Sequence, residues 1–261
     1  MVQVIKKFIS AGKQVFFMKH EADSSDSVIV YNSENALKFS FLSRPVSSTW
    51  DHRIKILEIV SSIRSLSSKN TPSNTIDIEI TKNVVLEQLR YCKKYEHLNV
   101  TFSVTLELSS LLDSAFLSKL LNNTSSNIII SMRHKNTSFS KSELTQLDSA
   151  MLSLRQQGVQ FCLENFLTDE TIDFDSLNYY DWDYIKISRT YFLNNISDKD
   201  LRDLTRLLLN GKCKLIIDGI DKVLHCITTK MSNSLIQGNV IGLPMKIDDS
   251  IYYYEKPYTT I

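Results

Sequence analysis

The amino-acid sequence predicts an α/β fold, and specifically a single (β/α)8-like, TIM-type barrel that spans residues 1–261. Three observations predict it. Apolar strand patterns alternate with helical patterns about eight times along the chain. A length of 261 residues suits one such barrel. Glycine and proline are scarce, at 6 and 4 residues, so no linker rich in them divides the chain.

Eight segments are expected to form strands, because each is a short run rich in β-branched and other apolar residues. In chain order they are QVFFMKH (14–20), LKFSFLSR (37–44), NVTFSVTLEL (99–108), NIIISM (127–132), VQFCLENF (159–166), YIKIS (184–188), KLIIDGI (214–220) and SLIQG (234–238). The segment TIDIEIT (75–81) fits either an additional strand or a loop before the next helix.

Three segments show apolar residues three to four positions apart, which is typical of amphipathic helices. They are HRIKILEIVSSIRSL (52–66), SELTQLDSAMLSLRQQ (142–157) and SDKDLRDLTRLLLNG (197–211). Ser142 or Ser140 is expected to cap the second helix, and Gly158 to end it. Segments rich in serine and asparagine, EADSSDS (21–27), SLSSKNTPSNT (65–75) and NNTSSN (122–127), are expected to be loops.

The composition is that of an ordinary soluble protein, with 43% hydrophobic and 23% charged residues. A formal net charge of +1 gives no general attraction to nucleic acid or to an anionic membrane. The chain shows no secretory signal and no apolar run long enough to cross a membrane. Its four cysteines are scattered and lack a CxxC pattern. We therefore expect a cytoplasmic protein that contacts neither membrane nor nucleic acid directly.

In a barrel of this type the functional side chains lie at the C-terminal ends of the strands. One of them, Lys186, lies within the apolar alternation of YIKIS, and an unpaired lysine is costly to bury. We expect it to pair with Asp218 or Glu164 in the barrel mouth. The candidate site residues are Ser40, Arg44, Glu107, Ser131, Glu164, Asn165, Lys186, Asp218 and Gln237.

Four stretches in the C-terminal half resemble motifs of the EAL-domain family, in the family's order. VQFCLENF stands where the family has LALDDFG, and YIKISRTYF is similar to LKIDRSF. LIIDGIDK is similar to VAEGVET, and IQGNVIGLPM to QGYLFGRPL. Residues 159–245 carry this resemblance. Members of the family are cyclic di-GMP phosphodiesterases with a barrel of this type.

The N-terminal half resembles the family by order and spacing. FSFLSR stands at the EALLR position, NVTFSVTLEL at the strand with VNLS, and NIIISMRH at the LEITE position. The resemblance implies that active members hold two divalent cations with carboxylate and amide oxygens. Carried over by position, these ligands become Ser40, Glu107, Ser131, Glu164 and Asn165.

Two serines in place of carboxylates, and an asparagine in place of an aspartate, remove about three negative charges from the two-metal site. We therefore expect no bound metal, no other cofactor and no phosphodiesterase activity. Lys186 corresponds to the family's catalytic lysine, Gln237 is unchanged, and Asp218 replaces a glutamate. Arg44 corresponds to an arginine that holds a ligand phosphate, and an ordinary surface arginine is an equal alternative.

Three functional classes follow from the resemblance. The first is a catalytically inactive regulator that binds another protein, such as a bacterial transcription regulator of motility or virulence. The pattern of losses resembles that of the YdiV-like regulators, degenerate EAL proteins that act in this way. The alternative is a non-catalytic receptor of cyclic di-GMP, which leaves open whether this ligand binds weakly or not at all. The third and least favoured class is an active phosphodiesterase.

Overall fold

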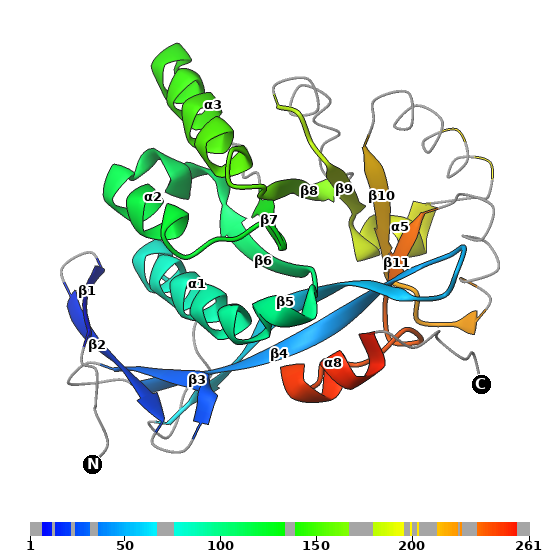
Figure 1. Ribbon diagram of the computed structural model, residues 1–261, viewed down its shortest axis with the longest axis horizontal. Helices are drawn as coiled ribbons and strands as arrows, with labels where there is room; N and C mark the ends of the chain where they lie inside the picture. The colour runs from blue at the N-terminus through cyan, green and yellow to red at the C-terminus, as the bar shows by residue number, and fades with distance from the viewer. Residues whose placement is uncertain are drawn as a thin grey trace.

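The computed structural model of the chain (Figure 1) describes residues 7–11, 14–21, 24–31, 36–66, 76–133, 139–166, 180–195, 213–223, 225 and 234–254, together with 199 and 203. Within these residues one sheet contains eleven strands in the order β1-β2-β3-β4-β11-β10-β9-β8-β7-β6-β5. A further pairing of β4 with β5 closes the last eight strands into a barrel. The expected TIM-type barrel is therefore confirmed.

The bounds of the strands are β1 (Lys7–Ala11), β2 (Gln14–Glu21), β3 (Ser24–Tyr31), β4 (Ala36–Ser48), β5 (Ile54–Ser65), β6 (Phe102–Glu107), β7 (Ile128–Arg133), β8 (Gln160–Phe166), β9 (Tyr184–Ile187), β10 (Lys214–Asp218) and β11 (Leu235–Gln237). The strands from β5 to β11 run parallel to one another, whereas β4 is antiparallel to both of its barrel neighbours, β5 and β11. The C-terminal ends of seven parallel strands therefore form one mouth.

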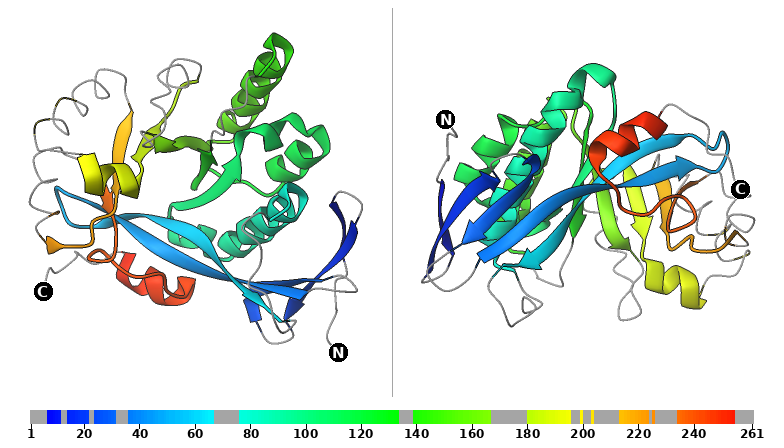
Figure 2. Two further views of the ribbon diagram at one scale, coloured as in Figure 1. Left: turned by 180° about the vertical axis from the view of Figure 1, so that it is seen from behind. Right: turned by 90° about the horizontal axis from the view of Figure 1, so that it is seen from below.

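The described helices are α1 (Ile78–Cys92), η1 (Lys93–Leu98), η2 (Leu108–Leu112), α2 (Ser114–Leu121), α3 (Lys141–Arg155), α5 (Arg189–Asn195) and α8 (Ile247–Tyr254). Figure 1 and the view from behind in Figure 2 show α1, α2 and α3 following one another along the outside of β6, β7 and β8. No described helix is long and apolar enough to span a lipid bilayer.

Strands β1 to β3 extend the sheet beyond the barrel as an antiparallel meander. Figure 1 shows them in dark blue at one end of the long strand β4, next to α1. Contacts join α1 to β1 and β3 on one side and to β6 on the other. This explains why ten of its fifteen residues are buried. The prediction that EADSSDS (21–27) forms a loop is wrong in part, because β3 begins at Ser24.

The prediction of a helix over residues 52–66 is wrong, because Ile54–Ser65 forms β5. Both faces of the first half of this strand are buried, with Ile56 inside the barrel and Leu57 and Ile59 under the outer layer. A strand buried on both faces shows no two-residue alternation. Its β-branched residues and its long pairing with β4 favour the strand.

Capping residues mark where two of the helices begin. TIDIEIT leads into α1, and the side chain of Asp77 accepts a hydrogen bond from the backbone N–H of Glu79 at 2.8 Å. Ser140 caps α3 in a capping box with Glu143. Gly158 follows this helix with φ of 84°, a conformation that favours glycine. The helix expected over 197–211 lies outside the described residues.

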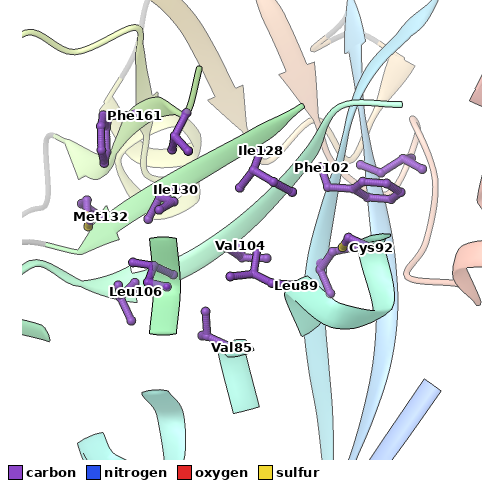
Figure 3. Packing of buried hydrophobic residues seen from close by; sticks show 14 of the residues in the cluster. Val85, Leu89, Cys92, Phe102, Val104, Leu106, Ile128, Ile130, Met132 and Phe161 are labelled. Carbon is purple, nitrogen blue, oxygen red and sulfur yellow. The ribbon is translucent and has the colours of Figure 1, made fainter. Parts of the chain in front are cut away.

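Two clusters of buried apolar side chains lie within the part of the chain that the structure describes. The larger one packs the outer helices onto the strands, and Figure 3 shows Val85, Leu89 and Cys92 of α1 facing side chains of β6 and β7. The smaller one lies inside the barrel and consists of Val46, Ile56, Ile129, Cys162, Tyr184 and Ile216, with Leu235 packed against it. This inner cluster forms the floor beneath the barrel mouth.

Candidate functional site at the barrel mouth

A layer of polar and charged side chains lies directly above the apolar floor. Residues two positions apart on a strand point to the same face. The floor residues Ile56, Cys162, Tyr184, Ile216 and Leu235 are therefore followed, toward the mouth, by Glu58, Glu164, Lys186, Asp218 and Gln237. On the antiparallel strand β4 the same step leads from Val46 back to Arg44.

Lys186 is the centre of this layer. Its Nζ donates a hydrogen bond to Oε1 of Glu58 at 2.7 Å and lies 3.7 Å from Oε1 of Glu164. The other oxygen of Glu58, Oε2, accepts a hydrogen bond from Nε2 of Gln237 at 2.6 Å. Lys186 was expected to pair with Asp218 or Glu164. It does lie near Glu164, but its main partner is Glu58, which was not among the candidate site residues.

Arg44 joins the antiparallel strand to two parallel ones. Its Nη2 donates to Oδ1 of Asp218 at 3.1 Å, and its Nη1 lies 3.6 Å from Oε2 of Glu58. Asp218 also accepts a hydrogen bond from the backbone N–H of Gly219 at 2.8 Å. Arg44 is therefore an ion-pairing residue of the mouth rather than an ordinary surface arginine.

Glu164 is held by two further side chains. Oγ1 of Thr105 donates to its Oε1 at 3.0 Å, and Nε of Arg133 donates to its Oε2 at 3.2 Å. The side chain of Glu164 is only 5% exposed, whereas that of Arg133 is 57% exposed. Arg133 therefore covers this carboxylate from the solvent side.

The three carboxylates and three basic side chains of the layer balance one another in charge. Burial favours the neutral form of Glu58, but the charge of Lys186, its hydrogen bond, Arg44 and Gln237 outweigh this and lower the pKa of Glu58 to about 2. Burial likewise lowers the pKa of Lys186, but Glu58, Glu164 and Asp218 outweigh it and raise the pKa above its ordinary value. Glu58 and Lys186 are therefore both charged near neutral pH.

Four of the predicted site residues lie away from this layer. Ser40 lies in the sheet extension, paired with Ser27 of β3 and Ser62 of β5. Ser131 belongs to a deeper level beside Cys162, and its hydroxyl is hydrogen-bonded to that of Ser103 at 2.8 Å. The remaining two are Glu107 and Asn165.

Glu107 ends β6 two residues beyond Thr105, and it is Thr105 that contacts Glu164. Asn165 is exposed and has φ of 56°, next to a register shift between Leu163 and Phe166. Asparagine tolerates this left-handed conformation better than most residues. Because Glu164 points into the barrel, the side chain of the next residue, Asn165, points away from it.

Three residues of the layer were missed from the sequence, namely Glu58, Thr105 and Arg133. Glu58 takes the place beside Lys186 and Gln237 that the sequence analysis gave to Ser40, so this carboxylate is present and not lost. A signal existed in ILEIV, where one glutamate interrupts an apolar run. For Arg133 the only signal was its position directly after the predicted strand NIIISM.

The residues at the mouth do not fit a pair of divalent cations. Such cations need carboxylate oxygens that are free to bind them. Here Glu58, Glu164 and Asp218 are each bound by a basic side chain, and the neighbouring oxygen of Thr105 is a neutral hydroxyl. Among the described residues no three His, Cys, Asp or Glu side chains form a cluster of metal-ligating geometry.

One polar atom of the layer remains without a partner. Oε1 of Gln237 is buried and accepts no hydrogen bond in the described structure, although its own amide group donates to Glu58. The following residue, Gly238, has φ of 155°, and a Cβ atom there would lie 2.4 Å from the backbone of Ile220. This close backbone approach fixes the position of Gln237.

Comparisons with known proteins agree with this architecture. A sequence model of the EAL domain family matches residues 36–244. No match was found among the curated proteins. The solved structures that resemble this chain include an EAL domain protein from Listeria monocytogenes, with a TM-score of 0.66 at 13% identity, covering 83% of this chain and 92% of that one.

Two further solved structures are similar. One is the EAL domain of FimX from Pseudomonas aeruginosa bound to c-di-GMP, with a TM-score of 0.64 at 17% identity, covering 79% of this chain and 90% of that one. The other is the cAMP-bound form of the EAL enzyme Bd1971, with a TM-score of 0.64 at 15% identity. That alignment covers 83% of this chain and 66% of Bd1971, so this chain spans about two thirds of that protein. These likenesses show the fold.

Proposed function

Because this chain belongs to the EAL domain family, we propose that it is a non-catalytic member of that family and acts by binding another protein. The partner we propose is a bacterial regulator, such as a transcription regulator of motility or virulence. One observation carries the first part of the proposal. Each carboxylate of the mouth layer is neutralised by a basic side chain from another strand.

This pairing opposes the chemistry of a two-metal phosphodiesterase. A divalent cation at Glu58 would have to displace the ammonium group of Lys186, which lies 2.7 Å away and is itself buried. An unpaired buried charge is strongly destabilising. A cation at Glu164 would likewise compete with Arg133. The ion pairs therefore favour a mouth without bound metal, in which no activated water is available.

The retained barrel supports the second part of the proposal. The described residues keep a large apolar core around a mouth whose charges already satisfy one another. A domain in which the fold persists without the reactive site can act through its outer surface. A stable protein interface buries roughly 1,200–2,000 Å² in total, and the outer faces of the helices and strand turns can supply this area.

A cyclic di-GMP receptor without catalysis is the second candidate. The ligand bound by FimX from Pseudomonas aeruginosa, and the basic residues Arg44 and Lys186 at the mouth of this chain, favour it. Against it, both basic groups are engaged by Glu58 and Asp218. A phosphate would have to separate these ion pairs before it could bind, because the layer has no surplus positive charge.

Isothermal titration calorimetry of the purified chain with cyclic di-GMP, with and without Mg²⁺, separates the candidates. The proposal predicts no saturable heat in either buffer. Saturable binding that Arg44→Met abolishes would establish the receptor instead. A Lys55→Met variant, which removes an exposed lysine that pairs with Asp51 outside the mouth, is the matched control.

A further inference from the structure

The turn between β4 and β5 carries the most exposed apolar side chain among the described residues. Trp50 is 82% exposed, whereas the chain's second tryptophan, Trp182, is 5% exposed. The turn lies where β5 begins, and so at the end of the barrel opposite the mouth. A tryptophan so exposed is unusual, because most large aromatic side chains are at least partly buried.

The backbone around Trp50 is held rigidly. Oγ of Ser48 accepts hydrogen bonds from the backbone N–H of Trp50 at 3.1 Å and of Asp51 at 3.4 Å. The backbone N–H and Oγ1 of Thr49 both donate to the carbonyl oxygen of Ser234, at 3.0 and 2.9 Å. The neighbours of Trp50 thus tie the turn to itself and to the start of β11, while the indole stays outside.

Asp51 completes the turn, and one exposed basic residue, Arg53, follows it in the chain. Its Oδ1 accepts from the backbone N–H of Arg53 at 3.2 Å, and its Oδ2 from Nζ of Lys55 at 2.6 Å. Lys55 is neutralised in this way. The side chain of Arg53 is exposed and forms no ion pair with any residue that the structure describes.

We propose that Trp50 and Arg53 form the anchor by which this domain binds its protein partner, at the end of the barrel away from the mouth. This inference rests on the proposed function and names the surface that performs it. The partner offers an apolar pocket for the indole, bordered by a carboxylate that pairs with the Arg53 guanidinium.

Two physical reasons support this anchor. Tryptophan and arginine are enriched among the residues that carry most of the binding energy at protein interfaces. A side chain on a turn that is already ordered loses less conformational entropy on binding than one on a mobile loop. The charge of Arg53 on the same turn favours an acidic partner surface, because like charge at an interface is unfavourable.

The test begins with the full chain carrying a photo-crosslinking p-benzoylphenylalanine at position 52, in the same turn, so that Trp50 stays intact; the chain is expressed in its native cells. A second chain carries it at position 152, where Leu152 is 58% exposed on α3. The protein that crosslinks at position 52 only is identified by mass spectrometry, purified and titrated. Titration uses the Trp182→Phe variant, in which Trp50 is the remaining tryptophan and reports burial by a blue shift of its emission.

We expect Trp50→Ala to weaken binding of the purified partner at least about 30-fold, and Leu152→Ala to leave it unchanged. Arg53→Glu should also weaken binding, and reversal of the pairing carboxylate on the partner to lysine should restore it. Circular dichroism of each variant checks that the barrel is folded.

Several results would overturn the inference. Capture of no protein at position 52, or wild-type affinity of Trp50→Ala for a partner captured at position 152, would show that this turn is not the anchor. The latter result would leave the proposed function intact. A Trp50-dependent dimer in analytical ultracentrifugation, or a blue shift on vesicles with anionic lipid, would assign the turn to a second copy or a membrane surface instead. Tight cyclic di-GMP binding with no captured protein would overturn the proposed function itself.

Discussion

The ammonium group of Lys186 lies 2.7 Å from Oε1 of Glu58, and this contact spans the barrel from one wall to the opposite one. Lys186 lies on β9 and Glu58 on β5, which are four strands apart in the closed order of eight. Gln237 of β11 and Arg44 of β4 contact the same carboxylate. The carboxylate of Glu58 thus links four strands across the mouth.

Lys186→Met should destabilise the domain by roughly 3–5 kcal/mol, because it leaves the buried carboxylate of Glu58 without its main partner. Urea denaturation at pH 7 measures this loss. The control is Lys55→Met, which breaks an exposed pair with Asp51 and should cost less than about 1 kcal/mol. Equal effects of the two substitutions would contradict the role assigned to Lys186.

Acid should remove the contribution of Glu58 to stability. The pKa of Glu58 is lowered from its ordinary value of 4.5 to about 2 in the folded state. Its contribution is therefore fully present above about pH 4.5 and is lost as the pH falls toward 2. Glu58→Gln should be less stable than wild type at pH 7, and the difference should shrink between pH 4.5 and 2. Urea denaturation across this range measures it, and a difference that stays constant would argue against a charged Glu58.

Gly238→Ala should disrupt the mouth without removing any polar group from it. A Cβ atom at this position would lie 2.4 Å from the backbone nitrogen and oxygen of Ile220, and φ of 155° adds backbone strain. We expect a loss of at least about 2–3 kcal/mol in the free energy of unfolding. Wild-type thermal stability of this variant would show that β11 does not approach Ile220 as described.

The sequence predicted the C-terminal half of the barrel well. Strands β8, β9, β10 and β11 lie within the segments expected from their short apolar runs, because buried parallel strands read as continuous apolar segments. The same property misled the prediction for residues 52–66. Ile56, Ile59 and Val60 fit a helical spacing equally well, and only pairing with β4 decides for the strand.

The candidate site followed the same pattern. Glu164, Lys186, Asp218 and Gln237 meet at the mouth, since the ends of parallel strands are brought together by the fold alone. Arg44 reaches the same mouth from the antiparallel strand β4. Glu58 was missed because its segment was assigned to a helix. Asn165 was misplaced because it directly follows the inward-facing Glu164, and two neighbouring residues of a strand point to opposite faces.

Whether the mouth lacks phosphodiesterase activity is tested most directly by incubating the purified chain with cyclic di-GMP and Mg²⁺ or Mn²⁺. Chromatography of the products measures hydrolysis. We predict no turnover above that of a buffer control with either cation, because the mouth carboxylates form ion pairs with Lys186, Arg44 and Arg133. Metal-dependent turnover that Lys186→Ala abolishes, in a variant shown to be folded by circular dichroism, would contradict it.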